Sequence, residues 1–262
     1  MGTLNRSAGG KLIAMKTGQP ILQASLPQGQ RALAGRPLPG VEPLKGADWL
    51  TIDDAYGAQL AEKARLLSAR PADVLAMQPR AAPAAQEALQ VVLGLLAGRA
   101  DFVVGAGHVR RPDMVQVQID WAAPLMTLSR LIQEDICILQ KQGDAHVLTG
   151  ALLCFPASWT LAEKLGRALV GIHKPVATYD PNIARRVQRL FDGVQVGRPL
   201  VRGNYLEYAD PSLFHPRTEA APRLNDHCNA AYARAERQTM VRLPQTRVVI
   251  FAIHKSVVRQ TQ

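Results

Sequence analysis

Residues 148–176 read LTGALLCFPASWTLAEKLGRALVGIHKPV, and the rest of the chain is organised around this stretch. It begins with an apolar, β-like run that ends at Pro156, and Thr160 and Glu163 have the spacing of a helix-capping pair. Gly166 can end the short helix, and a second apolar run then leads to His173. The pattern predicts a strand, a brief helix and a single histidine at the end of an apolar segment.

The flanking sequence predicts more strands. Upstream, two apolar runs surround the turn-forming residues 142–144, which is typical of an antiparallel hairpin. Downstream, apolar periodicity predicts a helix, and a second hairpin surrounds residues 243–246. The predicted segments are strands 136–139 and 147–155, helix 181–191, strand 200–208, loop 211–222, helix 226–235, and strands 236–242 and 247–255. Apart from the predicted helix 226–235, the order is a hairpin, a helical middle and three strands.

The first third of the chain is expected to be helical after a flexible N-terminal arm. Residues 1–40 mix Gly, Gln, Pro, Lys and Arg without periodicity, so we expect a loose arm. Apolar spacing predicts one helix between Tyr56 and Pro71 and another between Pro83 and Gly98, which would form a packing layer.

A loop, a possible strand and a short helix are expected after this layer. The predicted segments are a loop over 101–111, a half-buried strand or extended arm over 114–121, and a short helix over 124–131. The loop has two glycines spaced as Gly-x-Gly but lacks the third glycine of a dinucleotide-binding fingerprint. These patterns together predict an α+β protein. We expect the arm over 1–40 and one domain over 41–262.

The composition narrows the class of protein. Lys and Arg total 31 against 21 Asp and Glu, which gives a net charge of +10. Aromatic residues make up only 5% of the chain, and no RNA-recognition, zinc-finger or helix-turn-helix pattern occurs, so we predict no nucleic-acid partner. No apolar run approaches the ~18 residues of a membrane span and no secretory signal is recognised, so a cytoplasmic location without a membrane partner is expected.

Cysteines and histidines offer no multi-ligand metal site. Cys137, Cys154 and Cys228 lie far apart without a Cys-x-x-Cys motif, so neither a zinc site nor a dithiol is predicted. The six histidines include no His-Glu-x-x-His motif. His173 is open to two interpretations. It is either a packed, hydrogen-bonded histidine or a single axial ligand of haem iron.

Several short motifs follow one another along the chain, and their order bears on the interpretation of His173. They are Asp48-Trp49-Leu50 with Asp53, Tyr56 and Glu62-Lys63; Gln133-Glu134-Asp135; Cys154-Phe155-Pro156 with Trp159; Glu163-Lys164 with Gly166; Ile172-His173-Lys174-Pro175-Val176; Arg202 with Asn204; Glu236-Arg237-Gln238-Thr239; and Arg242-Leu243-Pro244. The ordered set resembles the haem-dependent oxidative N-demethylase family, which includes the catalytic α subunit of dimethylamine monooxygenase. The resemblance covers about residues 40 to 255.

The resemblance implies a haem-binding, PAS-like domain. Its fold would be an antiparallel sheet with helices on one face, preceded by the N-terminal helical layer. His173 would bind the iron of haem b, with His215 as the runner-up. A Cys154 thiolate ligand is disfavoured, because its surroundings are apolar.

The resemblance also suggests binding residues around the haem. The haem propionates would bind to Lys164, Arg202 and Arg237. Each of these residues could instead have an ordinary surface or ion-pair role. The candidate catalytic residues, none with an assigned role, are Glu236, Asn204 and Trp159. Glu236 could face a cationic amine or form a structural ion pair. Trp159 could supply an aromatic face or belong to the core.

The implied activity is oxidative N-demethylation of a small secondary amine. The enzyme would use O2 and electrons from a separate flavin or iron–sulfur reductase subunit, hydroxylate an N-methyl group and release formaldehyde. The basic surface could steer an acidic redox partner. Two departures, Tyr205 in place of Trp and Ala177 in place of Pro, bear on the pocket and on the substrate. The alternatives are a non-catalytic haem or small-ligand sensor on a PAS-like scaffold, and a structural protein without haem.

Overall fold

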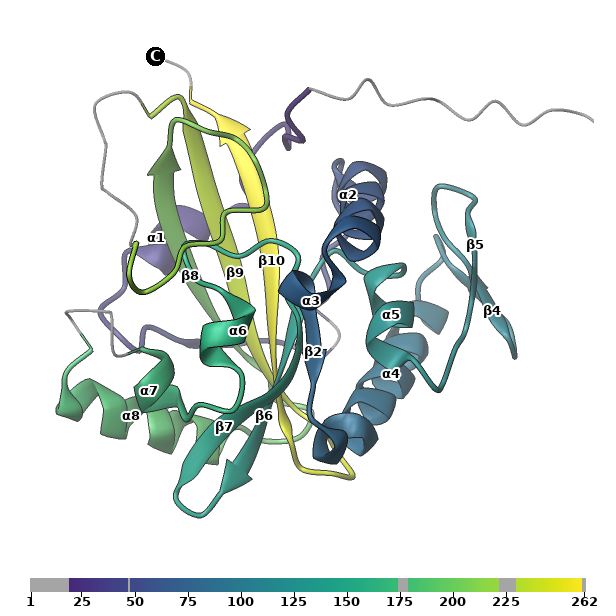
Figure 1. Ribbon diagram of the computed structural model, residues 1–262. Helices are drawn as coiled ribbons and strands as arrows, with labels where there is room; N and C mark the ends of the chain where they lie inside the picture. Colours follow the sequence, from purple (N-terminus) through teal and green to yellow (C-terminus); the bar gives the residue numbers. More distant parts are fainter. Residues whose placement is uncertain (1–18, 47, 174–178, 222–229, 261–262) are drawn as a thin grey trace, which may run out of the picture.

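The computed structural model describes residues 19–46, 48–173, 179–221 and 230–260, and its largest element is an antiparallel sheet (Figure 1). Seven strands lie in the order β1–β8–β9–β10–β6–β7–β2, and every neighbouring pair runs antiparallel. From edge to edge they are β1 (Glu42–Pro43), β8 (Leu200–Tyr208), β9 (Tyr232–Arg242), β10 (Val249–Arg259), β6 (Asp135–Gln142), β7 (Ala145–Leu152) and β2 (Leu75–Met77). The sheet therefore combines both predicted hairpins.

Helices and a small ribbon surround this sheet. The helices are α1 (Gln30–Ala34), α2 (Tyr56–Ala69), α3 (Pro71–Val74), the 3-10 turn η1 (Pro79–Ala81), α4 (Ala82–Ala97), α5 (Pro124–Ser129), α6 (Leu161–Lys164), α7 (Leu169–Ile172) and α8 (Pro181–Gly193). The ribbon is a second sheet of three short strands, β3 (Val103–Val104), β4 (His108–Arg110) and β5 (Gln116–Gln118). The α+β class is thereby confirmed.

Strand alternation defines two faces of the large sheet. Along β10, Ile253 and Lys255 point to the face that we call the front, whereas His254 points to the back. The register pairs Lys255 with Glu236 and His254 with Arg237, so Glu236 lies on the front and Arg237 on the back. This assignment decides which polar residues can meet.

The front face is partly covered by the helical middle of the chain. Leu161 of α6, Leu169 of α7 and Phe191 of α8 belong to a buried cluster with Cys137 and Ile253 of the sheet. Gly166 ends the segment after α6 with a φ of 81°, which favours glycine. The predicted order of a hairpin, a helical middle and three strands is confirmed.

A second and larger core lies under the N-terminal helices. Leu60 and Leu66 of α2, Leu89 of α4 and Leu128 of α5 pack with Ile138 of the sheet. These helices stand together beside the sheet on the right of Figure 1. The two long N-terminal helices were predicted from their apolar spacing, and both are confirmed.

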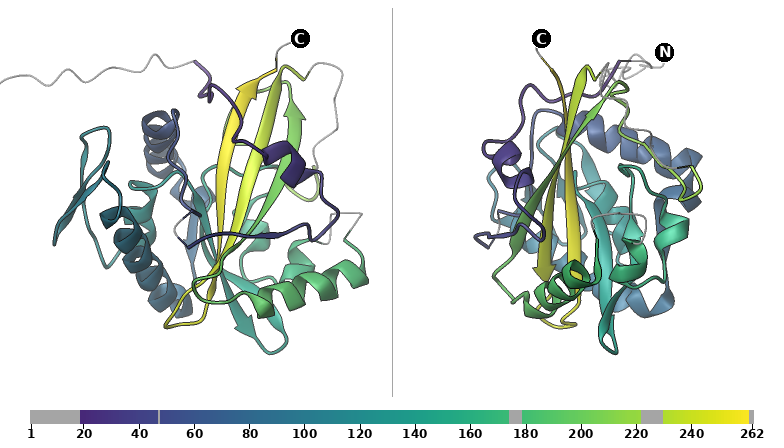
Figure 2. Two further views of the ribbon diagram at one scale, coloured as in Figure 1. Left: turned by 180° about the vertical axis from the view of Figure 1, so that it is seen from behind. Right: turned by 90° about the vertical axis from the view of Figure 1, so that its left-hand side faces the viewer.

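The described part of the predicted arm lies against the sheet. The Gln23 backbone nitrogen donates to the Val257 carbonyl, and the Val257 nitrogen donates to the Gln23 side-chain oxygen at 2.8 Å. The Gln30 side chain donates to the Glu236 carbonyl at 2.7 Å. Helix α1 crosses the back of the sheet, opposite α6 and α7 (Figure 2). Helices are thus not confined to one face, as the PAS-like prediction had them. Residues 1–18 lie outside the described residues.

Two local predictions are wrong. Residues 232–235 belong to β9 rather than to a helix, because Tyr232 and Arg234 alternate with small alanines and pair with both β8 and β10. Residues 226–229 of that predicted helix lie outside the described residues. The predicted loop over 101–111 contains β3 and β4, which form a ribbon with β5.

Replacement of Gly203 should loosen α1. A Cβ at residue 203 would lie 2.6 Å from the backbone nitrogen of Ala34, so Gly203→Ala should lower the free energy of unfolding by about 1–3 kcal/mol. The matched control is Gly94→Ala in α4, where the space is open; it should stabilise by roughly 0.5–1 kcal/mol. Urea denaturation measures both, and an unchanged stability for Gly203→Ala would contradict the packing of α1.

Candidate functional site

Five polar side chains meet on the front face of β8, β9 and β10, and we call them the polar row. Cross-strand register places Asn204 opposite Glu236, Glu236 opposite Lys255, and Arg202 opposite Gln238. Residues directly opposite each other on one face are close enough for their side chains to bond. The alternation of three strands therefore assembles this row.

Direct hydrogen bonds join the polar row. Arg202 Nη1 donates to Gln238 Oε1 at 2.8 Å, and Gln238 Nε2 donates to Glu236 Oε2 at 2.5 Å. Asn204 Nδ2 reaches the same carboxylate oxygen at 3.4 Å, while the Lys255 ammonium binds Glu236 Oε1. The row thus runs unbroken from Arg202 to Lys255.

Glu236 is a buried carboxylate with both oxygens engaged. Burial alone would raise the pKa of Glu236, but the Lys255 ammonium and the neighbouring donors hold it below its usual range. An incoming amine cation would have to displace Lys255 to reach this carboxylate. The arrangement favours the structural ion-pair interpretation, with Lys255 as the partner rather than the adjacent Arg237.

His173 is held at the end of α7 in a defined orientation. Its Nδ1 lies 2.8 Å from the Leu169 carbonyl, and a carbonyl can only accept, so Nδ1 carries the proton. Its ring stacks on Tyr179 with centroids 4.4 Å apart and an angle of 13°. Burial and the nearby charges of Arg202 and Lys164 lower the pKa of His173, and the hydrogen bond to the Leu169 carbonyl opposes that shift. The imidazole is therefore neutral near pH 7, and its lone pair lies on Nε2.

Arg202 lies near His173 and has unused binding capacity. Its Nε is buried and has no hydrogen-bond partner, and the guanidinium forms no ion pair within the described parts of the chain. Burial lowers the pKa of Arg202, and Glu236 opposes that shift. A buried guanidinium without a carboxylate is a favourable partner for an anion.

Lys164 supports the segment that carries His173. Its ammonium donates to the Ile172 carbonyl at 2.8 Å and to Glu219 Oε1 at 2.7 Å. The side chain is buried, and Glu219 also binds Arg167. Lys164 therefore fixes the residue before His173 and joins it to the loop of residues 209–221.

Arg237 lies on the opposite face from His173 and the polar row. Its guanidinium donates to the backbone carbonyl of Asp48 at 2.7 Å and to that of Trp49 at 3.4 Å. Tyr205, next to Asn204 on β8, likewise faces the back, where Arg31 of α1 lies over its ring. These two motif residues thus contact the N-terminal segments. Ala177 lies outside the described residues.

His215 is held in its loop by hydrogen bonds, and Cys154 lies in the apolar core. The His215 backbone pairs with residues 156–158, and its Nε2 lies 3.3 Å from the Asp210 carbonyl. Arg234 anchors this region by donating to four carbonyls, including those of Phe155 and Leu213. Cys154 is fully buried, and burial raises the pKa of its thiol, which disfavours a thiolate.

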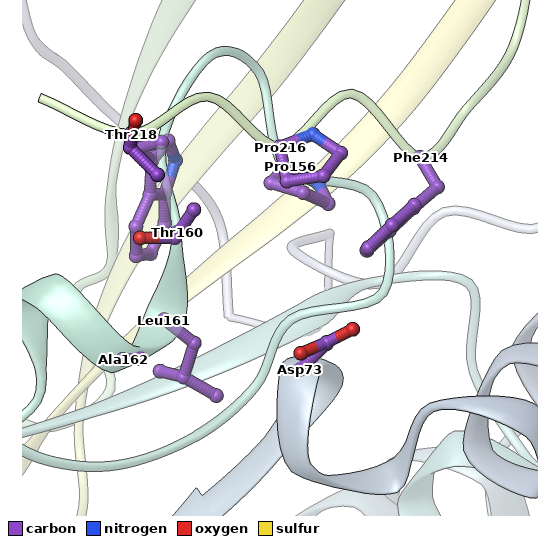
Figure 3. A pocket seen from close by; sticks show the side chains of 9 residues that line it. Asp73, Pro156, Thr160, Leu161, Ala162, Phe214, Pro216 and Thr218 are labelled. Atoms are coloured by element: carbon purple, nitrogen blue, oxygen red, sulfur yellow. The ribbon is translucent and has the colours of Figure 1, made fainter. Parts of the chain in front are cut away.

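A small cavity lies beside α6, where Leu161 and Ala162 line it (Figure 3). The cavity has a volume of about 240 Å³. It is lined by Asp73, Pro156, Trp159, Thr160, Leu161, Ala162, Phe214, Pro216 and Thr218. Trp159 also packs against the buried front cluster. The walls are mainly apolar and aromatic, so the cavity suits a small organic molecule.

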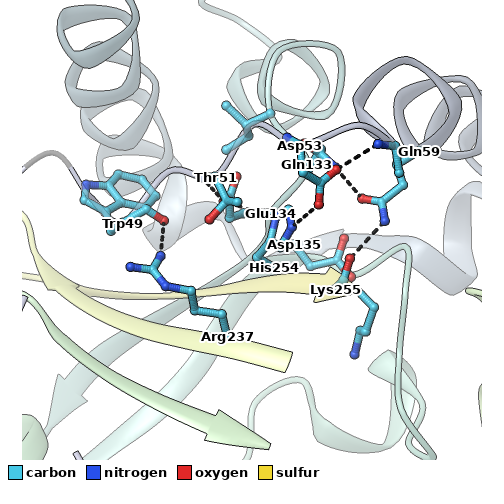
Figure 4. A network of polar contacts seen from close by, with 12 residues as sticks. Trp49, Thr51, Asp53, Gln59, Gln133, Glu134, Asp135, Arg237, His254 and Lys255 are labelled. Carbon is cyan, nitrogen blue, oxygen red and sulfur yellow. Dashed lines mark hydrogen bonds and ion pairs between the residues drawn. The ribbon is translucent and has the colours of Figure 1, made fainter. Parts of the chain in front are cut away.

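A second polar network lies on the back of the sheet (Figure 4). His254 Nε2 lies 2.9 Å from Asp53 Oδ2, and its Nδ1 lies 3.5 Å from Glu134 Oε1. Gln133 donates to Asp53 at 2.7 Å, and the Thr51 nitrogen donates to Glu134 at 2.7 Å. Burial alone would lower the pKa of His254, but the two carboxylates raise it to about 9. This charged cluster joins the start of α2 to β6 and β10.

Sequence reasoning missed three residues of the front site: Gln238, Lys255 and Tyr179. Gln238 could have been found, because it lies two positions after Glu236 in a predicted strand. Lys255 required the register of β9 with β10, and Tyr179 required the path of the chain after α7. Within the described residues, no three His, Cys, Asp or Glu side chains gather as a metal site, and no helix is long and apolar enough to cross a membrane.

A family model matches most of the chain. The model is described as haem-dependent oxidative N-demethylase, alpha subunit-like, and it covers residues 40–262. This range includes His173, every residue of the polar row, and the polar network on the back of the sheet. The chain belongs to this family, which confirms the resemblance inferred from the motifs.

Removal of the Lys255 ammonium should leave an uncompensated charge in the sheet. We expect Lys255→Met to destabilise the fold by about 3–5 kcal/mol, because Glu236 stays buried without its counter-ion. The double variant Glu236→Gln with Lys255→Met should recover most of this loss. Chemical denaturation measures both variants, and equal losses would refute the ion-pair account.

Replacement of His254 should change how stability depends on pH. The raised pKa means that charged His254 stabilises the fold fully below pH ~6.5, and this contribution disappears as the pH rises through about 9. The difference in unfolding free energy between wild type and His254→Gln should therefore shrink by roughly 3 kcal/mol across that interval. A difference that does not vary with pH would contradict the charged state of His254.

Proposed function

We propose that this member of the haem-dependent oxidative N-demethylase alpha-subunit-like family binds haem b and catalyses the N-demethylation of a small secondary amine. The observation that carries the proposal is the orientation of His173. A histidine that binds a metal almost always donates its other ring N–H to a carbonyl or carboxylate, and the Leu169 carbonyl supplies that partner. The donor set therefore fits haem.

The residues near His173 support the same reading. In the proposal, His173 would hold the haem iron through Nε2, and the Arg202 guanidinium would bind a haem propionate, which would satisfy its unpartnered Nε. Lys164 holds the Ile172 carbonyl and so positions the histidine from behind. Arg237, bound to two carbonyls on the other face, has no part in this set.

The proposed reaction needs an outside source of electrons. Haem, when bound, supplies the iron chemistry that uses O2 to oxidise an N-methyl group. The overall reaction takes one methylated amine, O2, two electrons and two protons to the demethylated amine, formaldehyde and water. The chain has neither a dinucleotide fingerprint nor a cysteine set for an iron–sulfur cluster. A separate flavin or iron–sulfur reductase subunit would supply the electrons, and the alpha-subunit description of the family supports a partner.

The cavity beside Trp159 is the proposed route or resting place for the amine. Its volume of about 240 Å³ admits a small amine. The Trp159 ring can attract an organic cation through its face, and most of the remaining walls are apolar. Asn204 would be the hydrogen-bonding group on the sheet, since Glu236 is occupied by Lys255. The chemistry favours a small secondary amine as the substrate class.

An absorption spectrum tests the ligand assignment. Wild type expressed with a haem precursor should show a Soret band, and His173→Ala should lose it or need added imidazole to restore it, because the axial nitrogen is missing. His215→Ala is the matched control and should keep the wild-type spectrum, since in the described parts of the chain its side chain lies against Asp210 and Tyr208. In haem titrations, Arg202→Gln should bind more weakly than Arg237→Gln.

The remaining outcomes separate the rival functions. A band that survives in His173→Ala but vanishes in His215→Ala would transfer the ligand role to His215. Formaldehyde release from a methylated amine, with a chemical reductant and O2, supports the enzyme. A haem-bound wild type without turnover favours the sensor. No Soret band in wild type would refute the haem proposal.

A further inference from the structure

Helix α8 has one face packed on the protein and one face in solvent. Val187, Leu190 and Phe191 pack against the buried front cluster, which fixes the rotation of the helix. Gln188 is also turned inward, where its amide bonds His146 and Asp192. The helix runs along the lower edge of the molecule, so its outer side faces solvent (Figure 1).

Three arginines occupy the outer side of α8, and we call them the arginine face. Arg185, Arg186 and Arg189 are exposed and have three- and four-residue spacings, which place them side by side on a helix. Other arginines, such as Arg65 and Arg111, are paired with carboxylates. Within the described residues, the three arginines of this face form no ion pair.

The helix that carries the arginine face begins two residues after Tyr179, whose ring contacts His173. Tyr179, whose ring stacks on His173, is followed by Asp180, and Asp180 caps the first turn of α8 by accepting from the Ile183 nitrogen at 2.7 Å. Helix α7, which ends at His173, also contacts α8. Val170 of α7 is 59% exposed, so an apolar side chain lies on the helix next to this basic surface.

We propose that the arginine face of α8 is the docking surface for an acidic electron-donor protein. Unpaired arginines bind carboxylates in a two-pronged geometry and are more weakly hydrated than lysines, which suits them to an interface. Their charge also speeds the approach of an acidic partner. A donor docked there would contact the helix that begins two residues after Tyr179, the stacking partner of His173. This inference rests on the proposed function, since it names the partner of that site.

Binding of an acidic iron–sulfur protein tests the docking surface directly. The probe is a plant-type [2Fe–2S] ferredoxin at low ionic strength, measured by biolayer interferometry against the full chain. The variant Arg185→Glu with Arg189→Glu should weaken binding by at least about tenfold, because it reverses the charge of the face. The matched control is Arg110→Glu with Arg130→Glu, which changes the net charge equally on exposed arginines of β4 and the end of α5. It should bind nearly as wild type does.

A second readout separates this inference from the proposed function. In haem-loaded protein, reduction by ferredoxin should slow in the α8 variant, while reduction by dithionite should proceed at the wild-type rate. If the chain takes up no haem, the proposed function fails, yet the binding comparison still decides the docking surface.

Three results would overturn the assignment. One is equal weakening in the α8 variant and the control, which would reflect net charge alone. Another is failure of wild type to bind the ferredoxin. The third is equally tight, α8-dependent binding of a random DNA duplex, because the face would then be a general polyanion site.

Discussion

Adjacent side chains of a β-strand point to opposite faces, and along β9 this rule separates Glu236 from Arg237. The separation divides the polar residues of the sheet into two groups with different tasks. On the front, Arg202, Gln238, Glu236 and Lys255 bond in a row beside His173. On the back, the charged groups bind the N-terminal segments. The paired register of β8, β9 and β10 therefore determines which motif residues lie on the same face of the sheet.

Both groups bury charge, and both contain almost complete partner sets. Buried ions are costly unless they are paired and hydrogen-bonded, and Lys255 is paired with Glu236 and His254 with Asp53. Buried atoms without a hydrogen-bond partner occur in both groups: Arg202 Nε on the front and Glu134 Oε2 on the back. On the front, an anionic ligand that carries iron would supply a hydrogen-bond acceptor for Arg202 Nε and a metal for the neutral His173 imidazole.

The sequence predicted the parts of this fold that have a periodic signal. Both hairpins, the strand over 200–208 and helix α8 follow from alternation or helical spacing. The packing of the N-terminal arm was missed because Gln23 and Gln30 bind the sheet through hydrogen bonds of isolated residues, which leave no periodic pattern in the sequence. The β9 segment at 232–235 was read as helix, since its alanines favour a helix until sheet pairing overrides them. His173 was singled out through the family motif, whereas the orientation of its ring depends on contacts with Leu169 and Tyr179.

A crystal structure of the chain with bound haem tests the central claim most directly. We expect the iron on Nε2 of His173, with Nδ1 still bonded to the Leu169 carbonyl, and a propionate on Arg202 at the front of the sheet. Glu236 should remain paired with Lys255. Iron bound to another residue, or a propionate on Arg237 at the back, would contradict the division of the sheet into a chemical face and a structural face.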